Sequence, residues 1–117
     1  MALSRPPTAQ ELHHRVAFDR RVQTNDGAGN RRGAFQEQFK VWAAFRSRGG
    51  SESVMAERLE GRNIIGVYLR SSAQTRKITS DWQMRDARTG EKYAVRIVDA
   101  VTDSRWVYLE ARTGSAS

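Results

Sequence analysis

The feature that most constrains this fold is a two-residue alternation of apolar and polar side chains, repeated in short segments. In Lys92–Asp99, the apolar Tyr93, Val95 and Ile97 occupy every second position. Alternation with this period is typical of a β-strand that buries one face. Residues 65–98 therefore predict two β-hairpin arms, and the rest of the chain can be arranged around them.

A strand, a bend and a turn are predicted inside this region. Residues 75–82 are expected to form a strand that bends and ends on Trp82, and the strand resumes over 83–85. Asp86, Thr89 and Gly90 then supply turn chemistry, because glycine adopts positive φ easily and aspartate hydrogen-bonds its own backbone.

The same alternation predicts further strands over residues 12–22, 35–46, 64–70 and 105–112. The strand 35–46 carries apolar groups on both faces, so it is either central in the sheet or meets another chain with its second face. The core is expected to hold four side chains from these strands and the bend: Trp42, Trp82, Tyr93 and Val95. In the first strand, Val16, Phe18 and Val22 are expected on one face, with Arg15, Asp19 and Arg21 on the other.

Six short strands in about 100 residues predict a mainly β fold, a small antiparallel barrel or sandwich. One short helix is expected over residues 52–60, capped by Ser51 and ended by Gly61, as a cover for one end of the sheet.

The length of 117 residues predicts a single domain over 11–113. Residues 1–10 contain Pro6-Pro7 and are expected to be a flexible arm, either a plain tail or a segment that orders against a neighbour. Residues 114–117 are expected to be a frayed tail.

Arginine dominates the charge of the chain. It supplies 17 of the 20 cations, and the net charge is +7. Arginine forms bidentate pairs with phosphate and carboxylate groups, so the surface is expected either to meet nucleic acid or an acidic partner, or to pair with the 13 acids of the chain itself. The cations are spread evenly along the sequence, which argues against a dedicated DNA-reading patch.

No catalytic, metal or cofactor site is expected. Cysteine is absent, and no nucleophile-elbow or phosphate-loop motif occurs. His13 and His14 are neighbours and are expected on opposite faces of a strand, unable to hold one metal together. The acids Asp81, Asp86, Asp99 and Asp103 are interpreted as turn and strand-end residues. No apolar run is long enough to span a membrane, and no signal sequence is evident at the N-terminus.

Residues 24–33 predict a loop that is long for a hairpin of this size. Arg31 and Arg32 in it are plausible phosphate contacts. The candidate loop residues are Asn25, Asp26, Gly27, Asn30, Arg31, Arg32 and Gly33.

An ordered set of short motifs resembles the phage head–tail joining family, also called head closure or stopper proteins, which includes members from gene transfer agents. The motifs are RVAF at 15–18, DGAGN at 26–30, FKVWA at 39–43, VMAxRL at 54–59, VYLR at 67–70, TRKIT at 75–79 and YAVRI at 93–97, with Arg20-Arg21, Gly49-Gly50, Asp81-Trp82 and Leu109-Glu110. The resemblance covers about residues 12–112.

This resemblance implies a β-barrel that assembles as a ring, usually a hexamer, at the neck of a virion or phage-like particle built in the bacterial cytoplasm. The ring docks below the portal and its adaptor, retains the double-stranded DNA without reading its sequence, and presents a surface to the tail terminator or tail tube. By this resemblance the loop residues above would gate the channel. Ion pairs between subunits or rings are expected from Arg46, Arg48, Arg70 and Arg76.

Two alternatives remain open from the sequence. A free nucleic-acid-binding barrel of the oligonucleotide-binding type would stack bases on exposed aromatic side chains, here Trp106 and Tyr108 beside Arg105 and Arg112. A tail terminator of the same neck is also a small β-rich ring protein.

Overall fold

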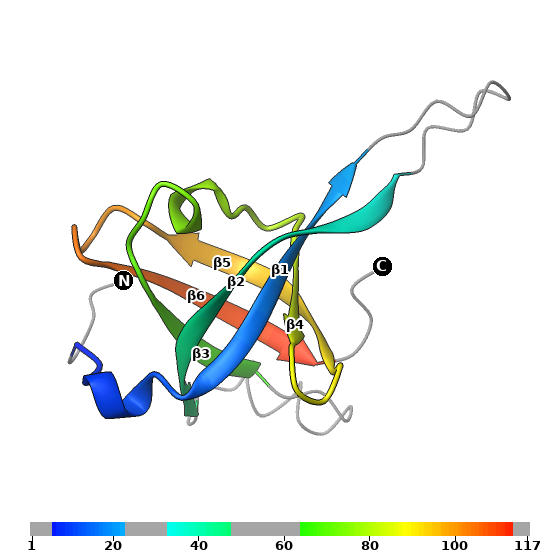
Figure 1. Cartoon of the computed structure of the whole chain (residues 1–117). Helices are drawn as coiled ribbons and strands as arrows, with labels where there is room; N and C mark the ends of the chain where they lie inside the picture. Colours follow the sequence, from blue (N-terminus) through cyan, green and yellow to red (C-terminus); the bar gives the residue numbers. More distant parts are fainter. Residues whose placement is uncertain (1–5, 23–32, 48–63, 114–117) are drawn as a thin grey trace, which may run out of the picture.

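The computed structural model describes residues 6–22, 33–47 and 64–113, which form an antiparallel sheet closed into a barrel (Figure 1). The strands are β1 (His14–Val22), β2 (Ala34–Ser47), β3 (Ile64–Arg70), β4 (Gln83–Asp86), β5 (Lys92–Asp99) and β6 (Trp106–Thr113), in the order β1-β2-β3-β6-β5-β4. This confirms the predicted mainly β class.

The expected helix over 52–60 lies outside the described residues. Within the described ranges, the helical elements are two 3-10 turns, η1 (Ala9–Glu11) and η2 (Thr75–Lys77). Residues 1–5 of the predicted arm 1–10 and the tail 114–117 also lie outside those ranges, so the arm and the frayed end stay predictions. Within the described part of the arm, Pro7 is buried and Ala9 begins η1.

Strands β1 and β2 are longer than the barrel they help to close, and Figure 1 shows them running past its body. The β2–β3 ladder extends only from Ser47 opposite Ile65 to Ala43 opposite Leu69. On the N-terminal side of Ala43, β2 pairs with β1 alone among the described strands. The two strands β2 and β3 therefore separate at a fork next to Trp42 and Arg70.

The inward-facing side chains, at every second position along the strands, build the core, as the sequence predicts. Val67 and Leu69 of β3 pair with Leu109 and Val107 of the neighbouring β6 on the inward face of the sheet, and all four are fully buried. Val16 and Phe18 of β1 join the same cluster. Burial of such side chains is the main favourable contribution to folding.

Two β-bulges shift the faces of their strands. One lies opposite Phe18 and Asp19, and the other lies between Val95 and Ile97. After the second bulge Val98 packs against the core, whereas Ile97 is 45% exposed. The prediction that Ile97 shares the buried face of Val95 is therefore wrong, because one extra residue reverses the alternation.

The assignment of Trp42 to the core is also wrong, since its side chain is 52% exposed. Its neighbours Val41 and Ala43 point into the barrel, so Trp42 points outward, and beyond the fork no described strand covers it. Trp82 and Val95 are buried as predicted, and Tyr93 packs partly buried against the core.

Residues 75–82 do not form the predicted strand; β4 begins only at Gln83. The buried hydroxyl of Thr75 donates to the carbonyl of Arg70 at 2.9 Å and accepts from the amide of Ser72 at 2.9 Å. Such bonds between side chain and backbone compete with a strand ladder. They fix a 3-10 turn, and the buried Ile78 and Trp82 fasten the segment that follows.

The predicted turn after β4 is confirmed. The Asp86 carboxylate accepts the amides of Arg88 at 2.8 Å and Thr89 at 3.1 Å, and Gly90 has a φ of 82°. Asp99 has an equivalent role after β5, accepting the amides of Val101 and Thr102.

A polar cluster on the outer side ties three strands together. The buried Asp19 of β1 accepts hydrogen bonds from Gln83 at 2.7 Å and from the Arg85 guanidinium at 3.1 and 3.2 Å, both on β4. Arg85 also donates to Glu37 of β2 at 2.8 Å. These two carboxylates raise the pKa of Arg85, so the guanidinium stays charged.

Removing this guanidinium should destabilise the barrel. The variant Arg85→Met keeps most of the side-chain stem but leaves Asp19 with fewer donors, and we expect a loss of about 2–3 kcal/mol in unfolding free energy. Urea denaturation measures it. Arg96→Met, which removes an exposed cation from β5, is the matched control and should change stability by less than about 0.5 kcal/mol. Equal losses in both variants would contradict the assigned role.

The turn that follows β5 predicts a lowered pKa for the Asp99 carboxyl. Hydrogen bonds from the Thr102 hydroxyl and from the amides of Thr102 and Val101 lower the pKa of Asp99 to about 2. The stabilisation is complete above pH 3.8, the ordinary value, and is lost as the pH falls through about 2. Carboxyl NMR titration measures this pKa. Thr102→Val should raise it, and a wild-type midpoint near the ordinary value would refute the assignment.

Candidate interaction surface

Most of the predicted channel-loop residues lie outside the described ranges: Asn25, Asp26, Gly27, Asn30, Arg31 and Arg32. Gly33, the last of the set, is described and buried. Its carbonyl accepts a hydrogen bond from Arg21 at 3.1 Å, and the Arg21 guanidinium lies 4.3 Å from the centre of the Phe35 ring. The base of the loop is thus held by contacts between the ends of β1 and β2.

Arg46, one of the predicted contact residues, already has a partner within the chain. Its Nε and Nη2 atoms each donate to the Glu11 carboxylate at 3.1 Å, and its guanidinium lies 4.6 Å from the centre of the Tyr68 ring. The hydrogen bonds to Glu11 raise the pKa of Arg46. This pair fastens the N-terminal turn η1 to β2.

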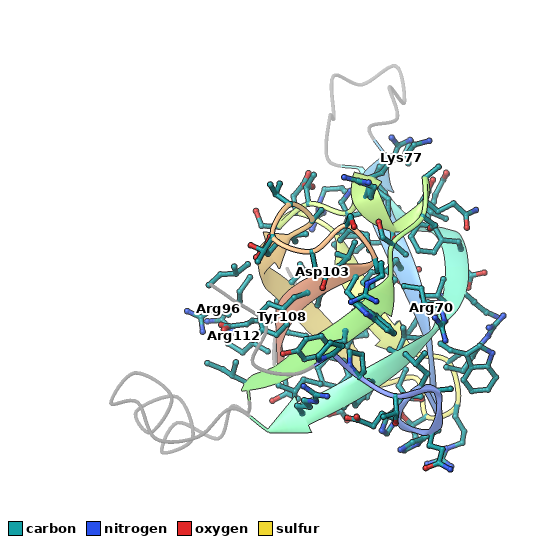
Figure 2. All side chains as sticks on the ribbon, turned by 90° about the vertical axis from the view of Figure 1, so that its left-hand side faces the viewer. Arg70, Lys77, Arg96, Asp103, Tyr108 and Arg112 are labelled. Carbon is teal, nitrogen blue, oxygen red and sulfur yellow. The ribbon has the colours of Figure 1, made fainter. Side chains whose placement is uncertain are left out.

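The other predicted contact arginines are not gathered at one place. Arg48 lies outside the described residues. Arg70 is the last residue of β3, whereas Arg46 of β2 pairs with Gly66 near the start of β3. Arg70 is exposed, and its guanidinium lies 5.2 Å from the centre of the Trp106 ring. Arg76 is exposed on η2. Figure 2 shows Arg70 on the outer side of the barrel, away from Arg96 and Arg112.

The sequence reasoning missed an exposed aromatic surface. Trp42 is ringed by exposed cations: Arg15, Lys40, Arg70 and Arg88. We call these five residues the Trp42 surface. Arg15 lies opposite Trp42 in the β1–β2 ladder and places its guanidinium 5.1 Å from the indole centre, a cation–π contact. The alternation around Trp42 was the available signal, because it puts the indole on the face opposite Val41 and Ala43.

Three hollows open around Trp42. One of about 360 Å³ is lined by His13, His14, Arg15, Asp86 and Arg88. A second, of about 330 Å³, lies at the fork between β2 and β3 and includes Leu12, Lys40, Val41 and Arg70 in its lining. The third, of about 410 Å³, includes Ala9, Leu12 and Arg70. Trp42 contributes to all three, so the indole stands as a ridge between them.

The cations of the Trp42 surface have no acidic partner in the described part of the chain. Among the described residues, none of Arg15, Lys40, Arg70 and Arg88 forms an ion pair. Of the described residues that line the three hollows, only Asp86 carries a carboxylate, and that group binds the amides of its own turn. The surface is therefore positively charged around an apolar centre.

The two histidines do not lie on opposite faces of a strand, because His13 precedes β1. Their ring centres are 4.3 Å apart, and His14 stacks on Phe45 at 3.9 Å. Burial, followed by the neighbouring His13, lowers the pKa of His14. In the part of the chain that is described, no three potential ligands are grouped to hold a metal, and no helix is long and apolar enough to cross a membrane.

The aromatic pair proposed for base stacking is not exposed. Trp106 is 7% and Tyr108 is 3% exposed. Tyr108 packs on Tyr68 with ring centres 4.9 Å apart and donates its hydroxyl hydrogen to Glu110. Stacking a base requires a free ring face, so this basis for a nucleic-acid-binding barrel is wrong.

Two solved structures share this fold. A chain from the virion of a native gene transfer agent particle aligns with a TM-score of 0.58 at 18% identity, over 97% of this chain and 100% of that chain. The solution structure of protein SF1141 from Shigella flexneri 2a aligns with a TM-score of 0.64 at 15% identity, over 93% and 98%. At these identities the likeness concerns the fold alone.

None of the curated proteins matches the chain. The family model described as phage head completion protein matches residues 7–114, which include all six strands. This match confirms the resemblance drawn from the motifs and identifies a structural, non-enzymatic protein. The chain belongs to the phage head completion protein family.

Proposed function

We propose that this chain forms the head closure ring at the neck of a phage or phage-like particle. In this role it docks below the portal and adaptor, retains the packaged DNA and offers the attachment surface for the tail. The observation that carries the proposal is the family match over residues 7–114. The ring is expected to be a hexamer.

The charge of the chain supports a position around DNA. A net charge of +7 favours the phosphate backbone without any need to read bases. The exposed cations outside the Trp42 surface come from several elements: Arg20 on β1, Arg76 and Lys77 on η2, and Arg96 on β5. Such a distribution suits a wall of positive charge better than a sequence-reading element.

The loop between β1 and β2 is our candidate for the gate of the channel. It joins the two strands that run past the barrel body, and it carries Arg31 and Arg32. The strand ends that flank it, Val22 and Ala34, lie beyond the last residue of β1 that pairs with β4. We assign this loop to the lumen of the proposed ring.

A tail terminator ring is the second candidate, because it too is a small β-rich ring of the same neck. The two roles differ in position, since head closure lies against the portal and adaptor whereas the terminator lies against the tail tube. Location within the particle therefore distinguishes them.

Loss of the gene should produce heads that fill but leak DNA and carry no tails. Electron cryomicroscopy of particles with and without the gene measures both properties and locates ring density at the neck. Full, stable heads with normal tails in the deletion strain would exclude a connector role. Ring density next to the tail tube rather than the portal would favour the terminator.

Deleting residues 27–32 should release DNA from filled heads while leaving the barrel folded, because these residues fall in the sequence between the end of β1 at Val22 and the start of β2 at Ala34. Nuclease sensitivity of the packaged DNA measures retention. The substitution Arg31→Gln with Arg32→Gln tests the phosphate contacts separately and should weaken retention less. Unchanged retention in the deletion variant would remove the gate assignment and leave the ring itself standing.

A further inference from the structure

We propose that the Trp42 surface is a docking site for a segment of a second copy of this chain. That segment carries carboxylates together with an aliphatic side chain that contacts Trp42. The proposal rests on the ring proposed above and specifies one contact within it. It starts from an exposed tryptophan, three adjacent hollows and four cations that have no acidic partner among the described residues.

Exposure of Trp42 is unusual for its residue type. A half-exposed indole on a rigid strand offers a large apolar contact at small entropic cost, and tryptophan and arginine are enriched among the residues that dominate binding energy at protein interfaces. The hollows at the fork between β2 and β3 can receive aliphatic side chains, since Leu12 and Val41 contribute to their lining. The surface thus combines an apolar ridge with apolar recesses.

The cations define the charge of the partner. Arg15, Lys40, Arg70 and Arg88 form no ion pair within the described part of the chain. A partner that brings carboxylates to the rim and an aliphatic side chain to the centre would complement both features. Duplex DNA supplies the negative charge, but its stacked bases offer no apolar surface to cover Trp42.

The chain itself contains a stretch of this chemistry. Residues 52–60 carry three glutamates against one arginine, together with Val54, Met55 and Leu59. In a protein with a net charge of +7, this is a local acidic excess next to aliphatic side chains. Since subunits of a ring repeat the same contact, one copy can offer the stretch and the next can offer the Trp42 surface.

The direct test uses the full-length chain labelled with ¹⁵N and a synthetic peptide of residues 51–61. We expect the peptide to shift the Trp42 indole signal and the amide signals of residues 12–15 and 40–42. Trp42→Ala should weaken binding by about tenfold or more, because a central aromatic anchor is lost. A peptide with Glu52, Glu57 and Glu60 changed to Gln should also bind more weakly.

The control variant is Val101→Ala, which trims an apolar side chain that is 88% exposed on the β5–β6 connection. It should bind the peptide as the wild type does. Absence of peptide binding, or shifts that map away from Trp42, would overturn the proposal. Shifts at Trp42 with a DNA duplex but not with the peptide would do so as well.

A charge exchange tests whether the contact joins two copies. One variant carries Lys40→Glu with Arg70→Glu, and the other carries Glu57→Lys with Glu60→Lys. Each alone should fail to form the neck ring, whereas producing both in one cell should restore it, because opposite charges then meet between copies. No restoration would overturn pairing between copies. Peptide binding without any neck ring in wild-type particles would instead refute the proposed function and leave the surface standing.

Discussion

Closure of the sheet by β1 is the constraint on which the rest of this structure depends. Strand β1 pairs with β2 on one side and with β4 on the other, and only residues Val16 to Asp19 make the second ladder. The Asp19 carboxylate and the Arg85 guanidinium reinforce this short seam. A sheet with four paired positions at its seam needs such support, because an open edge would invite pairing with other chains.

The seam also determines which surfaces remain for assembly. Inside the barrel, alternating side chains fill the space, so the interior is a core rather than a channel. In the proposed ring, a channel would therefore lie between subunits and be lined by outward-facing side chains. The outer face of β3 and β6 is largely buried by Tyr68, Trp106 and Tyr108, whereas the face around Trp42 is open.

Much of the fold could be predicted from alternation, since strands with one buried face carry a clear period. The same signal failed where a bulge or a fork intervened. Ile97 lies after an inserted residue, and no local pattern announces that insertion. Tryptophan is a residue type that is usually largely buried, but the exposure of Trp42 depends on where β3 separates from β2. That position is a property of the tertiary structure.

The candidate site was less predictable for a related reason. Arg46, Arg70 and Arg76 are similar in sequence terms, but one is paired with Glu11, one covers Trp106 and one is exposed on η2. The pairing of Arg46 joins residues 35 positions apart in the chain. The strand predicted over 75–82 failed because the hydroxyl of Thr75 satisfies backbone groups that a strand would have used elsewhere.

The overhang of β1 and β2 has a mechanical consequence. From Asp19 to Val22 the strand extends about 10 Å beyond the seam, at about 3.3 Å per residue. A ribbon clamped at one end behaves as a lever, so a small rotation at its root becomes a larger displacement at its tip. Mild substitutions at the Asp19–Arg85 contact should therefore displace the far end of the β1–β2 ribbon without unfolding the barrel.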